Sequence, residues 1–156
     1  MSDAAAVVAA LRTAGATTVT AESLTGGLVC SRLIDVPGAS DVVRGGVVAY
    51  APDLKTSLLG VSADDITAVG TVHPSIAEQM ARGARERLAA TYAVATTGVA
   101  GPDPSEGHPA GTVFIAVAGP DRVDVRSLRL PGTRAQIRTA TADAALDLLL
   151  AQVRQP

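Results

Sequence analysis

Short β-branched stretches alternate with helical stretches along the chain, and this alternation restricts its possible folds most strongly. Apolar residues at four-residue steps, such as Ile76, Met80, Ala84 and Leu88, are typical of a helix with one buried face. The predicted helices cover 3–14, 25–35, 52–59, 73–90 and 133–153, and the predicted strands cover 16–20, 42–50, 92–98, 112–119 and 122–130. Strands that alternate with helices and end in one hairpin predict an α/β layered domain with a mixed sheet.

The composition narrows the class of protein further. The 156 residues fit a single domain, 1–156, and 47% of them are hydrophobic while only 2% are aromatic. The core is therefore expected to consist of Ala, Val, Leu and Ile. Few aromatic rings and a net charge of -2 argue against a nucleic-acid partner, because such proteins stack bases on rings and carry basic surfaces.

The single cysteine and the two histidines indicate the redox compartment of the protein and whether it could hold a metal ion. Cys30 is the only cysteine, so no internal disulfide can form, which fits a reducing compartment. With only His73 and His108 beside it, no zinc site is expected. The N-terminus lacks a signal pattern, and no apolar run reaches the roughly 20 residues of a membrane helix. We expect a cytoplasmic protein without a membrane partner.

The segment "TAESLTGG", residues 20–27, joins a predicted strand to a predicted helix with two adjacent glycines. Glycines at such a turn let backbone N–H groups approach a ligand, and a helix N-terminus favours an anion. The alternative is an ordinary turn in which Ser23 or Thr25 caps the helix and the glycines serve turn geometry. Spacing alone does not separate the two.

The segment "PGASDVVRGGVVAYAPDLK" contains Ser40, Tyr50 and Lys55. A serine becomes a nucleophile when a neighbouring group accepts its proton, and a desolvated lysine amine can do so. Lys55 is the only lysine, whereas the other basic residues are arginines, which cannot become neutral at ordinary pH. The alternative is a cap serine, a half-buried tyrosine and a surface lysine.

Two further segments are rich in groups that could contact a ligand. The Gly- and Pro-rich loop after the strand at 92–98, "TTGVAGPDPSEGHPAGT", suits a ligand clamp, although it could be a solvated connection. Arg134 and Arg138 lie four residues apart near a helix N-terminus, where two guanidinium groups suit a phosphate. The alternative for this pair is a solvated helix face.

Taken together and in this order, these motifs resemble the CinA C-terminal domain family, with the resemblance running from about residue 5 to residue 153. The resemblance implies a three-layer α/β/α sandwich with a mixed sheet. It also implies a hydrolase of the pyridine nucleotide cycle (NAD salvage) that converts nicotinamide mononucleotide to nicotinic acid mononucleotide and ammonia, working without a cofactor, as a homo-oligomer, expected to be a dimer.

The resemblance also implies site residues. The catalytic ones are Ser40, Tyr50 and Lys55. The substrate-binding ones are Ser23, Thr25, Gly26, Gly27, Gly46, Thr96, Thr97, Gly98, Arg134 and Arg138.

A mechanism follows as a hypothesis: Ser40 attacks the carboxamide while neutral Lys55 accepts its proton, and Tyr50 holds the pair or passes the proton on. Backbone N–H groups near Gly98 or Gly26 would stabilise the oxyanion, and Arg138 would bind the phosphate. Ser23 remains an alternative nucleophile, as does direct attack by water. Two other functions stay open, namely a catalytically inactive pyridine-nucleotide-binding module and an amidase for another small amide.

Overall fold

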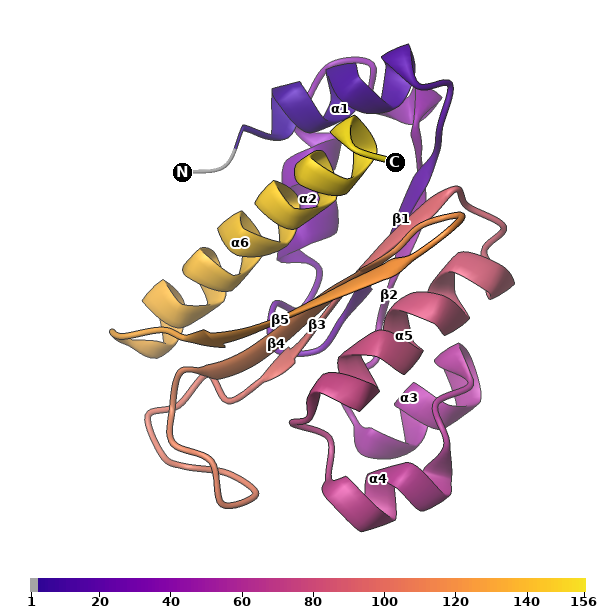
Figure 1. Ribbon diagram of the computed structural model, residues 1–156. Helices are drawn as coiled ribbons and strands as arrows, with labels where there is room; N and C mark the ends of the chain where they lie inside the picture. Colours follow the sequence, from indigo (N-terminus) through magenta and orange to yellow (C-terminus); the bar gives the residue numbers. More distant parts are fainter. Residues whose placement is uncertain (1–2) are drawn as a thin grey trace.

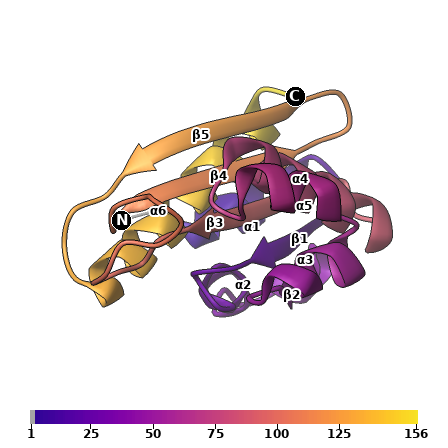
Figure 2. The same ribbon diagram turned by 90° about the horizontal axis from the view of Figure 1, so that it is seen from below.

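A mixed five-stranded sheet forms the centre of the computed structural model, which describes residues 3–156 (Figure 1). The strands are β1 (Thr18–Glu22), β2 (Val43–Val48), β3 (Tyr92–Gly98), β4 (Thr112–Ala118) and β5 (Val123–Arg129). The sheet order is β2-β1-β3-β4-β5, which Figure 2 shows from one edge to the other. β1 pairs in parallel with β2 and β3, whereas β4 is antiparallel to both β3 and β5. The predicted mixed sheet with a terminal hairpin is confirmed.

Helices cover both faces of this sheet. They are α1 (Ala4–Thr13), α2 (Leu28–Ile34), α3 (Pro52–Leu59), α4 (Ala63–Val69), α5 (Pro74–Arg87) and α6 (Arg134–Arg154), with a 3-10 helix at Ala39–Asp41. Figure 1 shows α1, α2 and α6 on one side of the sheet and α3, α4 and α5 on the other. Each side encloses its own cluster of buried Ala, Val, Leu and Ile side chains. The three-layer α/β/α arrangement is therefore confirmed. No helix within residues 3–156 is long and apolar enough to cross a membrane.

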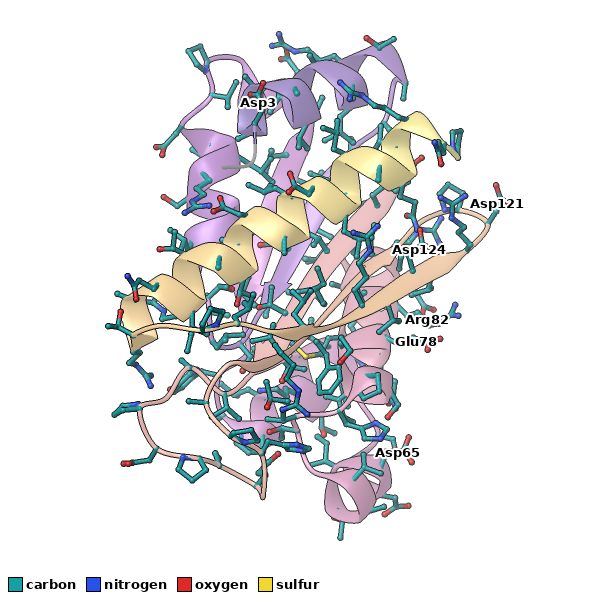
Figure 3. All side chains as sticks on the ribbon, turned by 60° about the vertical axis from the view of Figure 1, so that its left-hand side comes forward. Asp3, Asp65, Glu78, Arg82, Asp121 and Asp124 are labelled. Carbon is teal, nitrogen blue, oxygen red and sulfur yellow. The ribbon has the colours of Figure 1, made fainter. Side chains whose placement is uncertain are left out.

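The sequence pattern did not reveal α4, because that helix buries none of its residues. Only Ile66, partly buried, packs against the core, and polar contacts add to it. Ser62 caps the N-terminus of α4 by accepting a hydrogen bond from the N–H of Asp65. The side chain of Asp65, labelled in Figure 3, accepts a hydrogen bond of 2.8 Å from Gln79 on α5. A helix without an apolar stripe gives no periodic signal to detect.

Two adjacent glycines in β2, Gly45 and Gly46, are typical of a bulge or a close backbone approach. Both are present: the pairing register between β1 and β2 shifts, because Thr18 pairs with Val43 and Val19 with Gly45. At Gly46, an added Cβ would lie 2.3 Å from Oγ1 of Thr20. Gly46 thus lets β2 pack against β1.

The sheet topology decides where a site can form. β1 lies between β2 and β3, and the carboxyl ends of these three parallel strands meet at one edge. The chain leaves β1 through α2 on one face and leaves β2 through α3 on the other. In open α/β sheets, ligands bind in the crevice beyond the carboxyl ends of strands whose connections diverge in this way. This crevice adjoins the turn after Glu22 and the end of β3 at Gly98.

Candidate active site

The ammonium nitrogen of Lys55 lies beside the hydroxyl of Ser23 at this edge of the sheet. Lys55 is on α3, which starts with Pro52 at its first turn, and only 1% of the residue is exposed. Its Nζ donates hydrogen bonds to Ser23 Oγ (3.0 Å) and to the carbonyls of Ala49 (2.7 Å) and Tyr50 (3.2 Å). A buried lysine without an acidic partner in hydrogen-bonding distance is rare unless it serves a function.

The three contacts also determine how the amine is oriented once it loses a proton. Carbonyl oxygens only accept, so the two remaining N–H groups of a neutral Lys55 stay on Ala49 and Tyr50. The lone pair then faces the hydroxyl of Ser23, which can donate to it. Burial lowers the pKa of Lys55 from 10.5 to about 8, while the negative charge of Glu106 opposes this shift. The geometry and the charge state suit proton transfer from Ser23.

The turn that carries Ser23 is organised by a buried carboxylate. Glu22, the last residue of β1, accepts hydrogen bonds from the N–H groups of Gly27, Val29 and Cys30 at the start of α2. Gly26 and Gly27 have φ angles of +60° and +99°, which glycine adopts without strain. The carboxylate therefore takes the helix-capping role that Ser23 or Thr25 would otherwise fill, and both hydroxyls are free for other contacts.

Buried threonines of the turn and of β3 support the position of Ser23. The hydroxyl of Thr25 lies 2.9 Å from that of Thr96, which also accepts a hydrogen bond from the N–H of Ser23. Thr97 donates instead to the carbonyl of Thr71, at 2.8 Å. Thr25, Thr96 and Thr97 are all buried. These residues position the turn and the neighbouring segment rather than reach into open space.

A cleft of about 400 Å³ opens next to the turn. Its volume falls in the range of small-molecule sites, roughly 300–1,000 Å³. Its walls come from the Ser23 turn, the end of β3, the following loop, the segment after β2 and the start of α6. The lining residues are Leu24, Tyr50, Gly98, Val99, Ala100, Gly101, Pro102, Asp103, Ser105 and Arg134.

Tyr50 and Arg134 form one side of this cleft. Arg134 donates to the Tyr50 hydroxyl at 3.2 Å and to the Gly101 carbonyl at 2.7 Å. The Tyr50 side chain is 61% exposed, and it is its backbone carbonyl that contacts Lys55. Its hydroxyl thus contacts Arg134 rather than the lysine–serine pair. Gly98 also lines the cleft, and an added Cβ there would lie 2.7 Å from the carbonyl oxygen of Thr112.

Ser40 and Gly46 lie away from this cleft, contrary to expectation. Ser40 is in the 3-10 helix before β2, whereas Lys55 follows β2. β2 has six residues, and at about 3.3 Å per residue this strand spans roughly 20 Å between the two segments. The three hydrogen-bond acceptors of Lys55 Nζ are Ser23, Ala49 and Tyr50. The expected Ser40–Lys55 pair therefore does not form. Gly46 lines a separate groove beside Cys30 and Thr20, where its lack of a side chain serves packing.

Glu106 fastens the cleft-lining loop to the opposite side of the crevice. Its carboxylate accepts hydrogen bonds from the N–H groups of Thr71 and Val72 and from the Thr71 hydroxyl. Burial alone would raise its pKa, but these hydrogen bonds and the charge of His108 outweigh burial and lower the pKa of Glu106. The carboxylate therefore stays ionised at neutral pH, holding the loop and acting on Lys55.

Sequence reasoning overlooked Glu22 and Glu106 as parts of the site. A carboxylate directly before a glycine turn and a helix could have indicated Glu22, since helix N-termini favour negative charge. Nothing in the loop pattern singles out Glu106, because its partners lie 34 and 35 residues away. Among residues 3–156, no three His, Cys, Asp or Glu side chains are grouped to hold a metal ion.

The fold and the site together define a three-layer α/β domain with a buried lysine–serine pair beside a cleft at the carboxyl ends of its parallel strands. The chain belongs to the CinA C-terminal domain family, whose model matches residues 2–153.

Known relatives and solved structures agree with this assignment. A CinA-like protein of Frankia casuarinae is 54% identical over 134 residues, covering 86% of this chain and 31% of the relative. A CinA-like protein of Mycolicibacterium paratuberculosis is 49% identical over 142 residues, covering 87% of this chain and 33% of the relative. The chain thus spans about a third of the length of these curated relatives.

Two crystal structures share the whole architecture. The competence/damage inducible protein CihA from Agrobacterium tumefaciens is 38% identical, with a TM-score of 0.92 over 95% of this chain and 92% of that one. A CinA superfamily protein from Klebsiella pneumoniae is 27% identical, with a TM-score of 0.95 over 98% of this chain and 96% of that one.

Proposed function

We propose that this domain hydrolyses the carboxamide of nicotinamide mononucleotide to the carboxylate and ammonia, with Ser23 as nucleophile and Lys55 as general base. The observation that carries the proposal is the placement of Lys55 Nζ between two carbonyl acceptors and one serine hydroxyl. A neutral amine held in this way can accept only the proton of Ser23, which makes that oxygen nucleophilic. The implied Ser40 mechanism is replaced by this pair.

The steps balance without a further reactant except water. Ser23 Oγ attacks the carboxamide carbon as its proton moves to Lys55. The resulting ammonium protonates the amide nitrogen, so that the C–N bond breaks and ammonia leaves. The regenerated amine then deprotonates a water that attacks the acyl ester, and it returns this proton to Ser23 Oγ as the ester bond breaks. The N–H of Leu24, which follows the nucleophile on a strand-to-helix turn, stands where such folds place an oxyanion donor.

Substrate recognition is assigned to the side of the cleft formed by Arg134 and Tyr50. Arg134 is exposed at the N-terminus of α6, where both its charge and the helix dipole favour a phosphate. The exposed ring of Tyr50 suits a cationic pyridinium, because a positive charge is attracted to an aromatic face. A bound pyridinium near Lys55 would also favour the neutral amine.

Release of ammonia from nicotinamide mononucleotide by the purified chain tests the function. We expect turnover on this nucleotide and much slower turnover on free nicotinamide, because the phosphate contact with Arg134 is missing. Thermal stabilisation by the nucleotide without any ammonia would instead identify a binding module. Faster release from an unrelated small amide would identify a different amidase. In both of these cases the proposed reaction is wrong.

The pH dependence gives a second test, with its sign set by Lys55. The active form is the neutral amine, so kcat/KM should rise with pH through about 8 and level off above it. Because the charge of Glu106 raises the pKa of Lys55, Glu106→Gln should move the rising limb to lower pH. It should also raise KM. A carboxamide oxygen cannot replace all the hydrogen bonds that the carboxylate accepts from Thr71 and Val72, so the loop that lines the cleft is held less firmly.

Asp121→Asn provides the matched control for this measurement. It removes one negative charge from the β4–β5 turn, at the end of β4 opposite the cleft (Figure 3). The control should leave the pH profile and KM unchanged. An identical profile for Glu106→Gln and the parent protein would contradict the electrostatic role of Glu106.

A further inference from the structure

The guanidinium group of Arg138 is directed at the main chain of the Ser23 turn. Its Nε donates to the carbonyl of Leu24 at 2.8 Å, and its Nη2 donates to the carbonyl of Thr25 at 3.1 Å. Arg138 is half-buried on α6, and an added Cβ at Gly26 would lie 3.4 Å from Nη2. The turn therefore packs closely against the side chain of Arg138, whose two hydrogen bonds both go to the main chain of the turn.

These two contacts fix the direction of the N–H groups on the other side of the turn. A trans peptide unit is planar, so the N–H of Thr25 points opposite to the Leu24 carbonyl, away from Arg138. By the same geometry the N–H of Gly26 points away from the Thr25 carbonyl, and it donates to the carbonyl of Ser23 at 3.1 Å. The N–H of Gly26 is thus occupied, which leaves the neighbouring N–H groups of the turn as the possible oxyanion donors.

Two N–H groups adjacent to Ser23 stay available. Within residues 3–156, the backbone N–H groups of Leu24 and Thr25 donate to no acceptor of the chain. Leu24 lines the cleft, and Ser23 lies directly before it. Unused backbone donors next to a nucleophile are the usual means of stabilising a tetrahedral oxyanion. Arg138 holds the Leu24–Thr25 peptide plane, which carries the N–H of Thr25, directly through the Leu24 carbonyl. The plane that carries the N–H of Leu24 is held one step further on, because its Ser23 carbonyl accepts the hydrogen bond from Gly26, whose own peptide plane Arg138 holds through the Thr25 carbonyl.

We infer that Arg138 is a positioning residue that orients the Leu24–Thr25 segment as an oxyanion hole for Ser23, rather than a ligand of the substrate phosphate. The inference rests on the proposed function. Arg134, one helical turn earlier, lines the cleft with its guanidinium group and carries the phosphate contact. The two arginines thus have different roles although they lie on one face of α6.

Comparison of two substrates separates these roles. Nicotinamide riboside has the same carboxamide and ribose as nicotinamide mononucleotide but lacks the phosphate. Arg138→Met should lower kcat about 10²-fold on both substrates with little change in KM, the size found when one oxyanion donor is lost. Arg134→Met, the matched variant, should raise KM about tenfold more for the mononucleotide than for the riboside. A loss in Arg138→Met that disappears on the riboside would overturn the inference.

Amide hydrogen exchange gives a readout that does not depend on activity. The N–H of Gly26 should exchange faster in Arg138→Met, because its hydrogen bond to the Ser23 carbonyl is no longer supported from the other side. Arg138→Lys can restore at most part of the two hydrogen bonds to the Leu24 and Thr25 carbonyls. Its exchange rate at Gly26 and its kcat should therefore fall between those of the parent protein and of Arg138→Met. Unchanged exchange at Gly26 would overturn the positioning role. If the parent protein releases no ammonia, the proposed reaction is wrong. The exchange experiment still decides whether Arg138 positions the turn.

Discussion

Lys55→Met should abolish most of the turnover of nicotinamide mononucleotide, lowering kcat at least about 10³-fold. Removing one member of a nucleophile–base unit costs nearly as much as removing the whole unit. Methionine fills a similar volume without an amine, so Ser23 keeps its hydroxyl but loses its proton acceptor. The measurement is steady-state ammonia release at pH 8.5, where the parent amine is mostly neutral.

The folded state of this variant needs its own check. Loss of Nζ leaves the Ala49 carbonyl without its 2.7 Å donor, while the penalty of burying a charge at neutral pH disappears. These effects oppose each other, so we expect a change in thermal midpoint of only a few degrees. Because the ordinary amine titrates above 10 and the buried one near 8, the parent gains stability as pH rises between those values. Lys55→Met should lack this gain, and near-normal turnover by a folded Lys55→Met would rule out the proposed base.

Ser23→Ala should reduce turnover by a similar factor, whereas Ser40→Ala should have almost no effect. Only Ser23 lies within hydrogen-bonding distance of Lys55 Nζ, because Ser40 is at the other end of β2. The two substitutions are chemically identical, so any general effect of losing a hydroxyl cancels in the comparison. A severe loss in Ser40→Ala with normal turnover in Ser23→Ala would reverse the assignment.

Trapping the acyl intermediate identifies the nucleophile directly. Cleavage after arginine produces the peptides 13–32 and 33–44, so Ser23 and Ser40 fall on different fragments. After acid quenching during turnover, the mass of one acyl group should appear on peptide 13–32. An adduct on 33–44 would contradict Ser23 as nucleophile. Steady ammonia release with no initial burst and no adduct on either peptide would favour direct attack by water.

The element pattern of this chain was readable because most of its elements are short and punctuated. Pro52 starts α3, Thr133 begins α6 with a capping box, and the β4–β5 hairpin follows from two β-branched runs around Pro120. The missed helix, α4, lacks a buried face, so no hydrophobic period could indicate it. Where local chemistry and core burial agree, the sequence pattern predicts the element; where only tertiary contacts hold a segment, it does not.

The composition of the site was harder to predict than the fold. The uniqueness of Lys55 pointed to a special residue, and its burial fits that interpretation. The sequence contained two serines on turns near glycines, and nothing local distinguishes them. The arginines at 134 and 138 likewise have equal residue chemistry and adjacent positions on one helix face.

Sequence alone determined the succession of strands and helices along the chain apart from α4, the aliphatic core and the presence of one lysine among arginines. These features depend on residue type and on spacing within a few positions. The tertiary structure decided that Lys55 meets Ser23 and not Ser40, that Arg138 holds a turn while Arg134 faces the cleft, and that Glu106 clamps a distant segment. The physical reason is the parallel arrangement of β1 and β2. Parallel pairing brings the ends of these strands to one edge of the sheet, and so joins residues that are 32 positions apart in the chain.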